Sequence, residues 1–343
     1  MRKQNIHIST KNIMAAIMCS CLALSACSAN YTTIANNSKL LSVKTDKHPI
    51  HATFVNKDKA SSLLATHDAY INRLSTFDWQ SKFKSEQALT ATQLKAYYAK
   101  ATLDWTDEYT KKVQIAIDIL QNKTADLNLN LPTNIKFILS NGLVEADSAY
   151  TRQDYIVLPT EYLKSTQAFI NHVIAHEFFH IYSRYNYKHR EQLYAIVGYQ
   201  KIPEVELPKI VADNVITNPD APNINYAITL SHKGNEQTFV PILYSKVPYD
   251  INNDALPFLF FMNEAFLPIN VIQEKTKVDS NYHPLFVDKK DTNFDEIAKP
   301  NSHYLNHPEE MLAEHFAMWV IDDDKIKHQQ PINELIDTMR SIK

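Results

Sequence analysis

Glycine is scarce in this chain, with only three among 343 residues. The three stand far apart, at Gly142, Gly198 and Gly234. A loop that cradles phosphate groups, or the turn of a dinucleotide-binding site, needs several glycines within a few residues of each other. The sequence therefore excludes the common nucleotide-binding classes, and we expect no nucleotide partner.

Cysteine is equally rare, and Cys19, Cys21 and Cys27 all lie near the N-terminus. The first two fall inside an apolar run, 13–24, that follows a basic start. A run of about 12 residues is too short to cross a bilayer. A basic start followed by a short apolar run is typical of an export signal. Removal of that signal leaves Cys27 alone, so the exported chain is expected to have no disulfide and to depend on an ordinary hydrophobic core.

Positive charge is also in slight deficit, with 35 Lys and Arg against 38 Asp and Glu. Three of the bases (Arg2, Lys3 and Lys11) and none of the acids precede Cys27. The remaining chain therefore has 32 bases and 38 acids, a net charge of −6. A mildly acidic protein lacks the basic surface that nucleic acid requires, and we expect no nucleic-acid partner.

The four residues that end the signal read Leu24-Ser25-Ala26-Cys27. This sequence resembles the lipobox of bacterial lipoproteins, which implies cleavage before Cys27 and attachment of lipid to that cysteine. Ser28 follows, and a residue other than Asp there usually accompanies sorting to the outer membrane. The resemblance implies a lipid-anchored protein of the cell envelope, facing the periplasm or the exterior. An ordinary secretory signal with an incidental cysteine is the alternative.

The most informative segment is 169–185, which reads FINHVIAHEFFHIYSRY. Apolar residues recur in it at spacings of three and four, which predicts an amphipathic helix. His176 and His180 share one face of that helix, and Glu177 stands one step round. Two imidazoles at this spacing can bind one cation, while the glutamate can contact a water molecule on it. The alternative is a buried helix with two hydrogen-bonded histidines, and these would be costly to bury unless something paired them.

His-Glu-x-x-His is the pattern of zinc peptidases. Before it, the chain shows a helical region, a strand at 135–139 and a hairpin of strands at 147–151 and 155–158. This order resembles the zincin metallopeptidases. The resemblance implies an α+β fold, mainly helical, with a small mixed sheet. It also implies that the edge strand, 147–151, lines the cleft and pairs with an extended peptide.

A catalytic zinc ion needs a third protein ligand. Metzincins place a histidine six residues after the second one, where this chain has Asn186. The remaining large class, the gluzincins, uses a glutamate from a later helix, and a helix is predicted to begin at 306–309. By that resemblance Glu310 is the third ligand, and Glu314, four residues on, supports a zinc-binding histidine from the second shell. Three other glutamates stay open as the ligand: Glu314 itself, Glu309 and Glu264. It also stays open that Glu310 and Glu314 lie on a solvent-exposed face of the helix and bind no metal.

The resemblance implies a zinc-dependent peptidase acting on a peptide or protein. Glu177 would be the general base that activates water. Tyr304 is the preferred donor to the developing oxyanion, with His303 and Tyr182 as alternatives. Two other functions stay open, a non-catalytic zinc-binding envelope lipoprotein and a cell-wall peptide hydrolase.

The rest of the chain is divided by composition and periodicity. We predict a signal peptide at 1–26, a flexible tether at 27–59 and a metallopeptidase domain at 60–343. The predicted domain begins with a helical lead-in at 60–131, with helices at 63–74 and 92–121, and continues with the sheet and motif helix at 132–200, with a short helix at 190–198. An inserted α/β subdomain is predicted at 201–295, with a hairpin of strands at 226–230 and 238–244 and a buried helix or helix pair at 256–272. The third-ligand helix and the C-terminal helix are predicted at 296–343.

Overall fold

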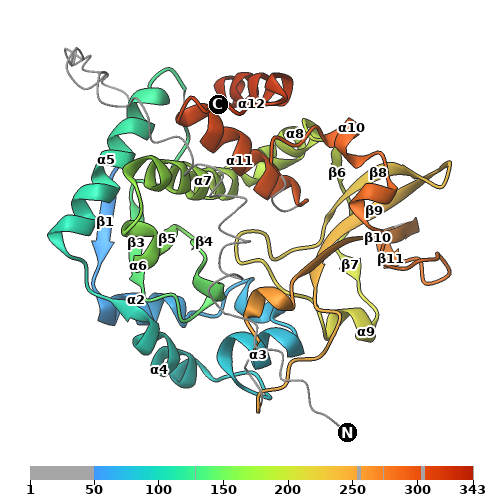
Figure 1. Cartoon of the computed structure of the whole chain (residues 1–343), viewed down its shortest axis with the longest axis horizontal. Helices are drawn as coiled ribbons and strands as arrows, with labels where there is room; N and C mark the ends of the chain where they lie inside the picture. Colours follow the sequence, from blue (N-terminus) through green and yellow to red (C-terminus); the bar gives the residue numbers. More distant parts are fainter. Residues whose placement is uncertain (1–49, 128, 253–255, 273, 303–305, 343) are drawn as a thin grey trace, which may run out of the picture.

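A computed structural model describes residues 50–127, 129–252, 256–272, 274–302 and 306–342. The predicted signal and Cys27 lie outside these residues. Within them, no helix combines the length and the apolar character needed to cross a membrane. The described chain forms helices and two separate sheets (Figure 1), which confirms an α+β fold.

The first sheet carries strands in the order β1-β3-β5-β4, and β1, β3 and β5 run parallel. β4 pairs antiparallel with β5 and forms the edge, so the predicted small mixed sheet with a hairpin at its edge is confirmed. The edge strand begins at Tyr150, later than predicted, because Glu145–Asp147 forms a 3-10 turn. The strands are β1 (Ala52–Val55), β2 (Thr102–Leu103, paired with the end of β3), β3 (Ile135–Ser140), β4 (Tyr150–Arg152) and β5 (Tyr155–Pro159).

Helices cover both faces of this sheet (Figure 1). Along β3, Phe137 and Leu139 point to one hydrophobic core and Ile138 to the other. A strand segment that is buried on both faces needs apolar residues at successive positions, which explains the apolar run Phe137–Leu139 in β3. The helices on one side are α5 (Asp107–Lys123), α7 (Gln167–Tyr185) and α11 (Pro308–Val320); those on the other are α2 (Lys57–Leu64), α3 (Thr76–Phe83) and α4 (Ala91–Ala101).

The second sheet has six strands in the order β6-β8-β9-β10-β11-β7, all of which are labelled in Figure 1. The predicted hairpin around Gly234 is confirmed as β8 and β9. The segment 201–295 is therefore mostly sheet, where an α/β subdomain was predicted. The strands are β6 (Tyr199–Lys201), β7 (Val205–Glu206), β8 (Tyr226–His232), β9 (Asn235–Tyr244), β10 (Asn263–Ile272) and β11 (Lys275–Val278). The remaining helices are α6 (Thr160–Leu163), α8 (Arg190–Ala195, shorter than the helix predicted at 190–198), α9 (Lys209–Ala212), α10 (Phe294–Ala298) and α12 (Gln329–Ser341).

The helix or helix pair predicted at 256–272 is wrong. After a short 3-10 turn at Phe258–Phe260, the chain forms β10, which pairs with both β9 and β11. Ala265–Ile269 of this strand are buried without interruption. A strand buried on both faces produces the same continuous apolar run as a buried helix, so periodicity could not separate the two.

Two further helix predictions in the lead-in are wrong. The helix predicted at 63–74 ends at Leu64, and only Ile71–Arg73 continues as a 3-10 turn. The single helix predicted at 92–121 is two helices, α4 and α5, separated by β2. Thr106 begins α5 by accepting the N–H of Tyr109 at 3.2 Å, and this N-cap interrupts the apolar periodicity that predicts one helix.

The folded body also begins earlier than residue 60. β1 pairs with β3, and α2 starts at Lys57 with its N-cap Asn56 accepting the N–H of Lys59 at 3.0 Å. The end of the predicted tether is therefore part of the first sheet and the lead-in. The boundary at 59–60 is wrong because a four-residue edge strand is too short to show periodicity.

Candidate metal centre

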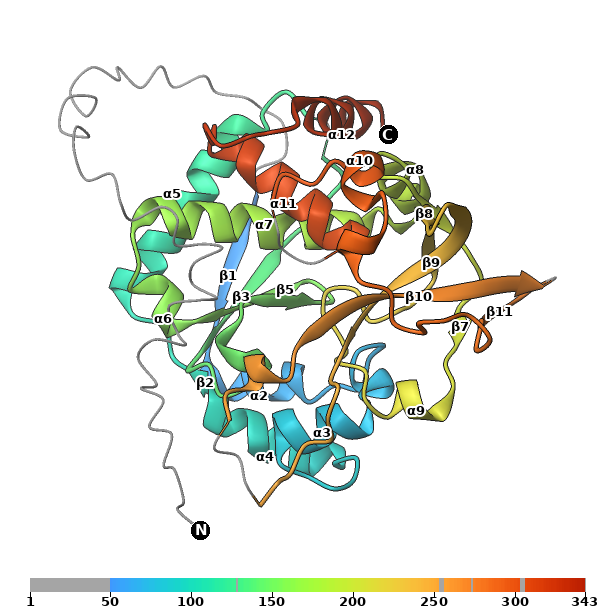
Figure 2. The same cartoon turned by 45° about the vertical axis from the view of Figure 1, so that its right-hand side comes forward.

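α7 and α11 lie side by side across the top of the first sheet (Figures 1 and 2). α7 begins after Thr166, whose hydroxyl accepts the N–H of Phe169 at 3.3 Å. α11 begins at Pro308, as the sequence predicted, and the ring of His307 accepts the N–H of Glu309 at 3.2 Å. The two caps fix where each helix starts, so that the histidine face of α7 meets the glutamate face of α11.

The three predicted metal ligands come together between these helices. Nε2 of His176 lies 3.2 Å from Oε2 of Glu310, and Nε2 of His180 lies 3.7 Å from the same oxygen. Ligand atoms of a tetrahedral zinc ion, bound at about 2.0–2.1 Å, stand about 3.4 Å apart. The observed separations match that geometry. All three side chains are buried, with exposed fractions of 9%, 0% and 2% for His176, His180 and Glu310.

Two buried atoms at the centre have no hydrogen-bond partner among the described residues. They are Nε2 of His180 and Oε2 of Glu177. A buried polar atom left unsatisfied destabilises a protein by about 1–3 kcal/mol. A cation on the imidazole would remove that penalty, and two imidazoles with one carboxylate are a donor set that zinc prefers. The residues present therefore fit a zinc ion.

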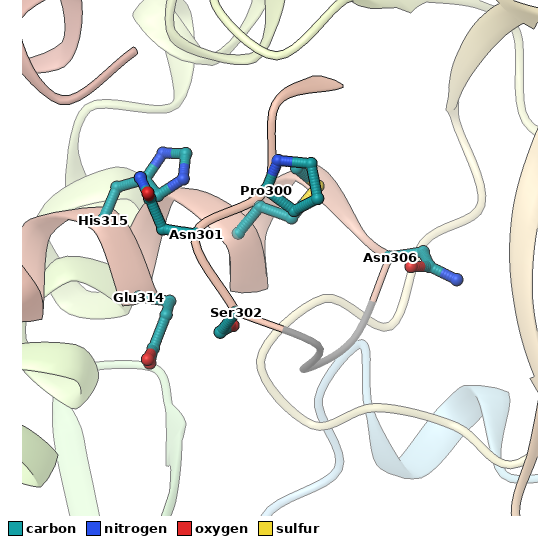
Figure 3. Close-up of a pocket in the computed structure, with 7 residues that line it drawn as sticks. Pro300, Asn301, Ser302, Asn306, Glu314 and His315 are labelled. Atoms are coloured by element: carbon teal, nitrogen blue, oxygen red, sulfur yellow. The ribbon is translucent and has the colours of Figure 1, made fainter. Parts of the chain in front are cut away.

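A carboxylate lies beside His176, the first of the two predicted histidine ligands. Oε2 of Glu314 lies 3.5 Å from Nδ1 of His176 and 3.1 Å from Nε2 of His172. Figure 3 shows that Glu314 and its neighbour His315 project to different sides of α11. The structure thus places Glu314 where the sequence put the supporting residue, although His172, one turn before His176, was not predicted.

A second supporting carboxylate, Glu309, was missed. The sequence leaves Glu309 open only as an alternative metal ligand. Its Oε1 lies 3.0 Å from Nδ1 of His180, and its Oε2 accepts hydrogen bonds from the hydroxyls of Ser183 (2.7 Å) and Tyr194. This contact holds the proton on Nδ1 and turns Nε2 of His180 toward Glu310. Glu309 and Glu310 can both contact histidines of α7 only when the two helices pack in a suitable orientation, and the sequence does not specify that orientation.

The buried acids and histidines of the centre shift each other's pKa values. Burial alone would raise the pKa of Glu310, but the charges of His180 and His176 lower it to about 2. Burial alone would lower the pKa of His180, but the charges of Asp220 and Glu310 raise it to about 9. Without a metal, these carboxylates therefore favour the protonated form of His180. A cation that binds its Nε2 must release that proton.

We expect Glu309→Gln to weaken zinc binding by about 10- to 100-fold while the site still fills at saturating zinc. The amide keeps the size of the side chain but loses the charge that orients His180. Competition with a chromophoric zinc chelator measures the affinity. Glu161→Gln, an exposed change on α6, is the matched control. Equal affinity in wild type and Glu309→Gln would show that this carboxylate does not support the metal.

Two residues of the second-sheet region also reach the centre, and the sequence predicted neither. Nδ2 of Asn218 donates to Oε1 of Glu310 at 2.6 Å. Asp220 lies with Glu177 and His180 in a group whose ligand atoms are all within 4.8 Å of one another. Burial and then the charge of Asp220 raise the pKa of Glu177 to about 8. Both residues stand on an irregular, proline-containing segment far from the motif, where no spacing rule applies.

The other predicted candidates lie elsewhere. Tyr304 and His303 are outside the described residues. Tyr182 packs in the hydrophobic core against Phe179, with ring centroids 6.2 Å apart. Glu264 accepts the N–H of Asn306 at 2.8 Å and lines a cleft of about 350 Å³ that also borders Asn218.

No protein-family model, curated protein or solved structure matches this chain. The function must therefore be argued from the chemistry of the centre.

Proposed function

We propose that this protein is a zinc-dependent peptidase in which His176, His180 and Glu310 hold the metal. The observation that supports this proposal is that the ligand atoms of the three residues lie within 4.8 Å of one another. In addition, Nε2 of His180 has no hydrogen-bond partner among the described residues, and Glu177 is buried nearby. Zinc held there would polarise a carbonyl group and make water nucleophilic near neutral pH. The gluzincin resemblance of the sequence predicts the same ligand set.

Glu177 is the proposed general base. Its Oε2 is buried and faces no hydrogen-bond donor among the described residues, so it is available to a water molecule. Burial and the nearby charge of Asp220 raise its pKa into the range where a carboxyl can both accept and return a proton. It takes the proton from the attacking water and passes it to the leaving amine. A purely structural zinc site would have no use for this residue.

The surroundings offer a place for an extended peptide. β4 is the edge of the first sheet and packs against α7, so a peptide added to it would pass the metal ligands. The cleft of about 350 Å³ beside Asn218 and His307 provides room for side chains. Anchoring of the enzyme to the cell envelope through lipid on Cys27 remains part of the proposal and rests on the lipobox resemblance.

Metal content tests this proposal directly. We expect about one zinc per full chain by plasma mass spectrometry, and loss of it in both His180→Ala and Glu310→Ala. Glu161→Gln should keep the metal. Zinc lost with His180→Ala but kept with Glu310→Ala would move the third ligand to another carboxylate. No zinc in any sample after reconstitution would contradict the proposal.

A further inference from the structure

The segment 217–224 crosses the metal centre and is held at both ends. At its start, Thr217 donates its hydroxyl to Asp78 of α3 at 2.6 Å, and its carbonyl accepts from Nζ of Lys82 at 2.9 Å. At its end, Ile224 donates its N–H to Glu204 at 2.9 Å. The segment 217–224 is therefore fixed between α3 and the loop that precedes β7, and we call it the strap. Asn218 and Asp220 are part of the strap.

Asp220 occupies the edge of the first sheet. Its Oδ1 accepts both the backbone N–H and the hydroxyl of Thr151, at 2.7 and 2.6 Å. Thr151 is the central residue of β4, and it gives its N–H to Asp220 and not to β5. Arg184 of α7 donates to Oγ1 of Thr151 at 2.9 Å and to the carbonyl of Asp220 at 3.3 Å. The backbone donor that an added peptide strand would use is thus already taken.

The same side chain also reaches the metal centre. Oδ1 is bound to Thr151, but the carboxylate still belongs to a group in which ligand atoms of Glu177, His180 and Asp220 lie within 4.8 Å of one another. Water must occupy the position next to Glu177 if that residue is to take its proton. Asp220 is 7% exposed, and its carboxylate is the third member of this group with Glu177 and His180. A carboxylate oxygen here can serve as a ligand in the position that water needs.

We propose that Asp220 is a fourth, displaceable metal ligand that keeps the resting enzyme closed. With zinc bound, one side chain would then take both the position that water needs beside Glu177 and the outward N–H of β4. A peptide needs both, so it must displace Asp220 before it can be cut. This inference rests on the proposed zinc site and adds its regulation.

Two substitutions distinguish the contact of Asp220 with Thr151 from its proposed contact with the metal. Asp220→Asn keeps an oxygen for Thr151 but removes the anionic ligand, whereas Asp220→Ala removes both. Cobalt(II) loaded into the full chain reports its ligands through visible absorption, and acetohydroxamate is the probe for an open position. We expect both variants to bind acetohydroxamate at least about tenfold more tightly than wild type, with an altered cobalt spectrum. Peptide hydrolysis should rise in both, and more in Asp220→Ala. Asp213→Asn, on the same region of the chain, should match wild type.

Equal acetohydroxamate affinity in wild type and both variants would overturn the inference. Loss of hydrolysis in Asp220→Asn at unchanged acetohydroxamate affinity would also overturn it, because Asp220 would then assist the reaction. Failure of wild type to bind cobalt or zinc would instead refute the proposed function. If the Asp220 variants do not fold, Thr151→Val removes one of the two hydrogen bonds that Oδ1 of Asp220 accepts from Thr151. It should shift acetohydroxamate binding in the same direction by a smaller factor, and no shift would contradict the proposal.

Discussion

Glu177→Gln is expected to bind zinc with the same stoichiometry as wild type and to lose peptide hydrolysis by about 100- to 10,000-fold. The residue is not among the three proposed ligands, so its charge is not required to hold the metal. Glutamine has nearly the same shape but cannot accept a proton. The measurement is zinc content together with the initial rate of cleavage of a quenched fluorescent peptide library.

Two comparisons make this result decisive. Glu161→Gln removes an exposed carboxylate of α6 and should leave the rate unchanged. His180→Ala should lose both zinc and hydrolysis, whereas Glu177→Gln should lose only hydrolysis. A Glu177→Gln rate within tenfold of wild type, with the metal in place, would exclude Glu177 as the base. Absence of cleavage in wild type despite bound zinc would favour the non-catalytic alternative.

Much of the centre could be predicted because its information is local. The spacing of His176 and His180 places both on one face of any helix, and Pro308 followed by acidic residues identifies a helix start. The hairpin of β4 and β5 was also predictable, because a polar turn at 152–154 separates two short apolar segments. These features depend on neighbouring residues only, and the structure reproduces them.

The residues that complete the centre depend on distant packing. Glu309 faces His180 because α11 packs against α7. Asp220 reaches the centre because Thr217 is fastened to α3, whose partner residues lie about 140 positions away in the sequence. β10 was mistaken for a helix because its sheet neighbours, which bury both of its faces, are also set by tertiary structure. No periodicity or spacing rule contains this information.

Lys82→Met is expected to lower the free energy of unfolding by about 3–5 kcal/mol. The side chain of Lys82 is 2% exposed and pairs with Glu145 at 2.8 Å and with Asp78 at 3.3 Å. Burial alone would lower the pKa of Lys82, but these two carboxylates raise it, so the lysine is charged in the folded state. Methionine fills similar space but leaves two buried acids without their cation. Urea unfolding followed by circular dichroism measures the loss.

Lys209→Met is the matched control. Lys209 also pairs with an aspartate four residues away, Asp213 at 2.6 Å, but its side chain is 86% exposed. Its loss should change stability by no more than about 0.5 kcal/mol. Lys82→Met combined with Glu145→Gln should recover part of the loss, because one unpaired buried charge is removed as well. A Lys82→Met variant within about 1 kcal/mol of wild type would show that the buried cluster is not a strong anchor.

This anchor also connects stability to the regulation of the metal centre. Lys82 holds the carbonyl of Thr217, and Thr217 begins the strap that carries Asp220. A strap freed at this end can leave β4 more easily, so Asp220 should be easier to displace. Lys82→Met, studied at a temperature where it is folded, should therefore bind acetohydroxamate more tightly than Lys209→Met. Equal binding by the two variants would mean that the contacts of Asp220 with Thr151 and Arg184 hold the strap without help from α3.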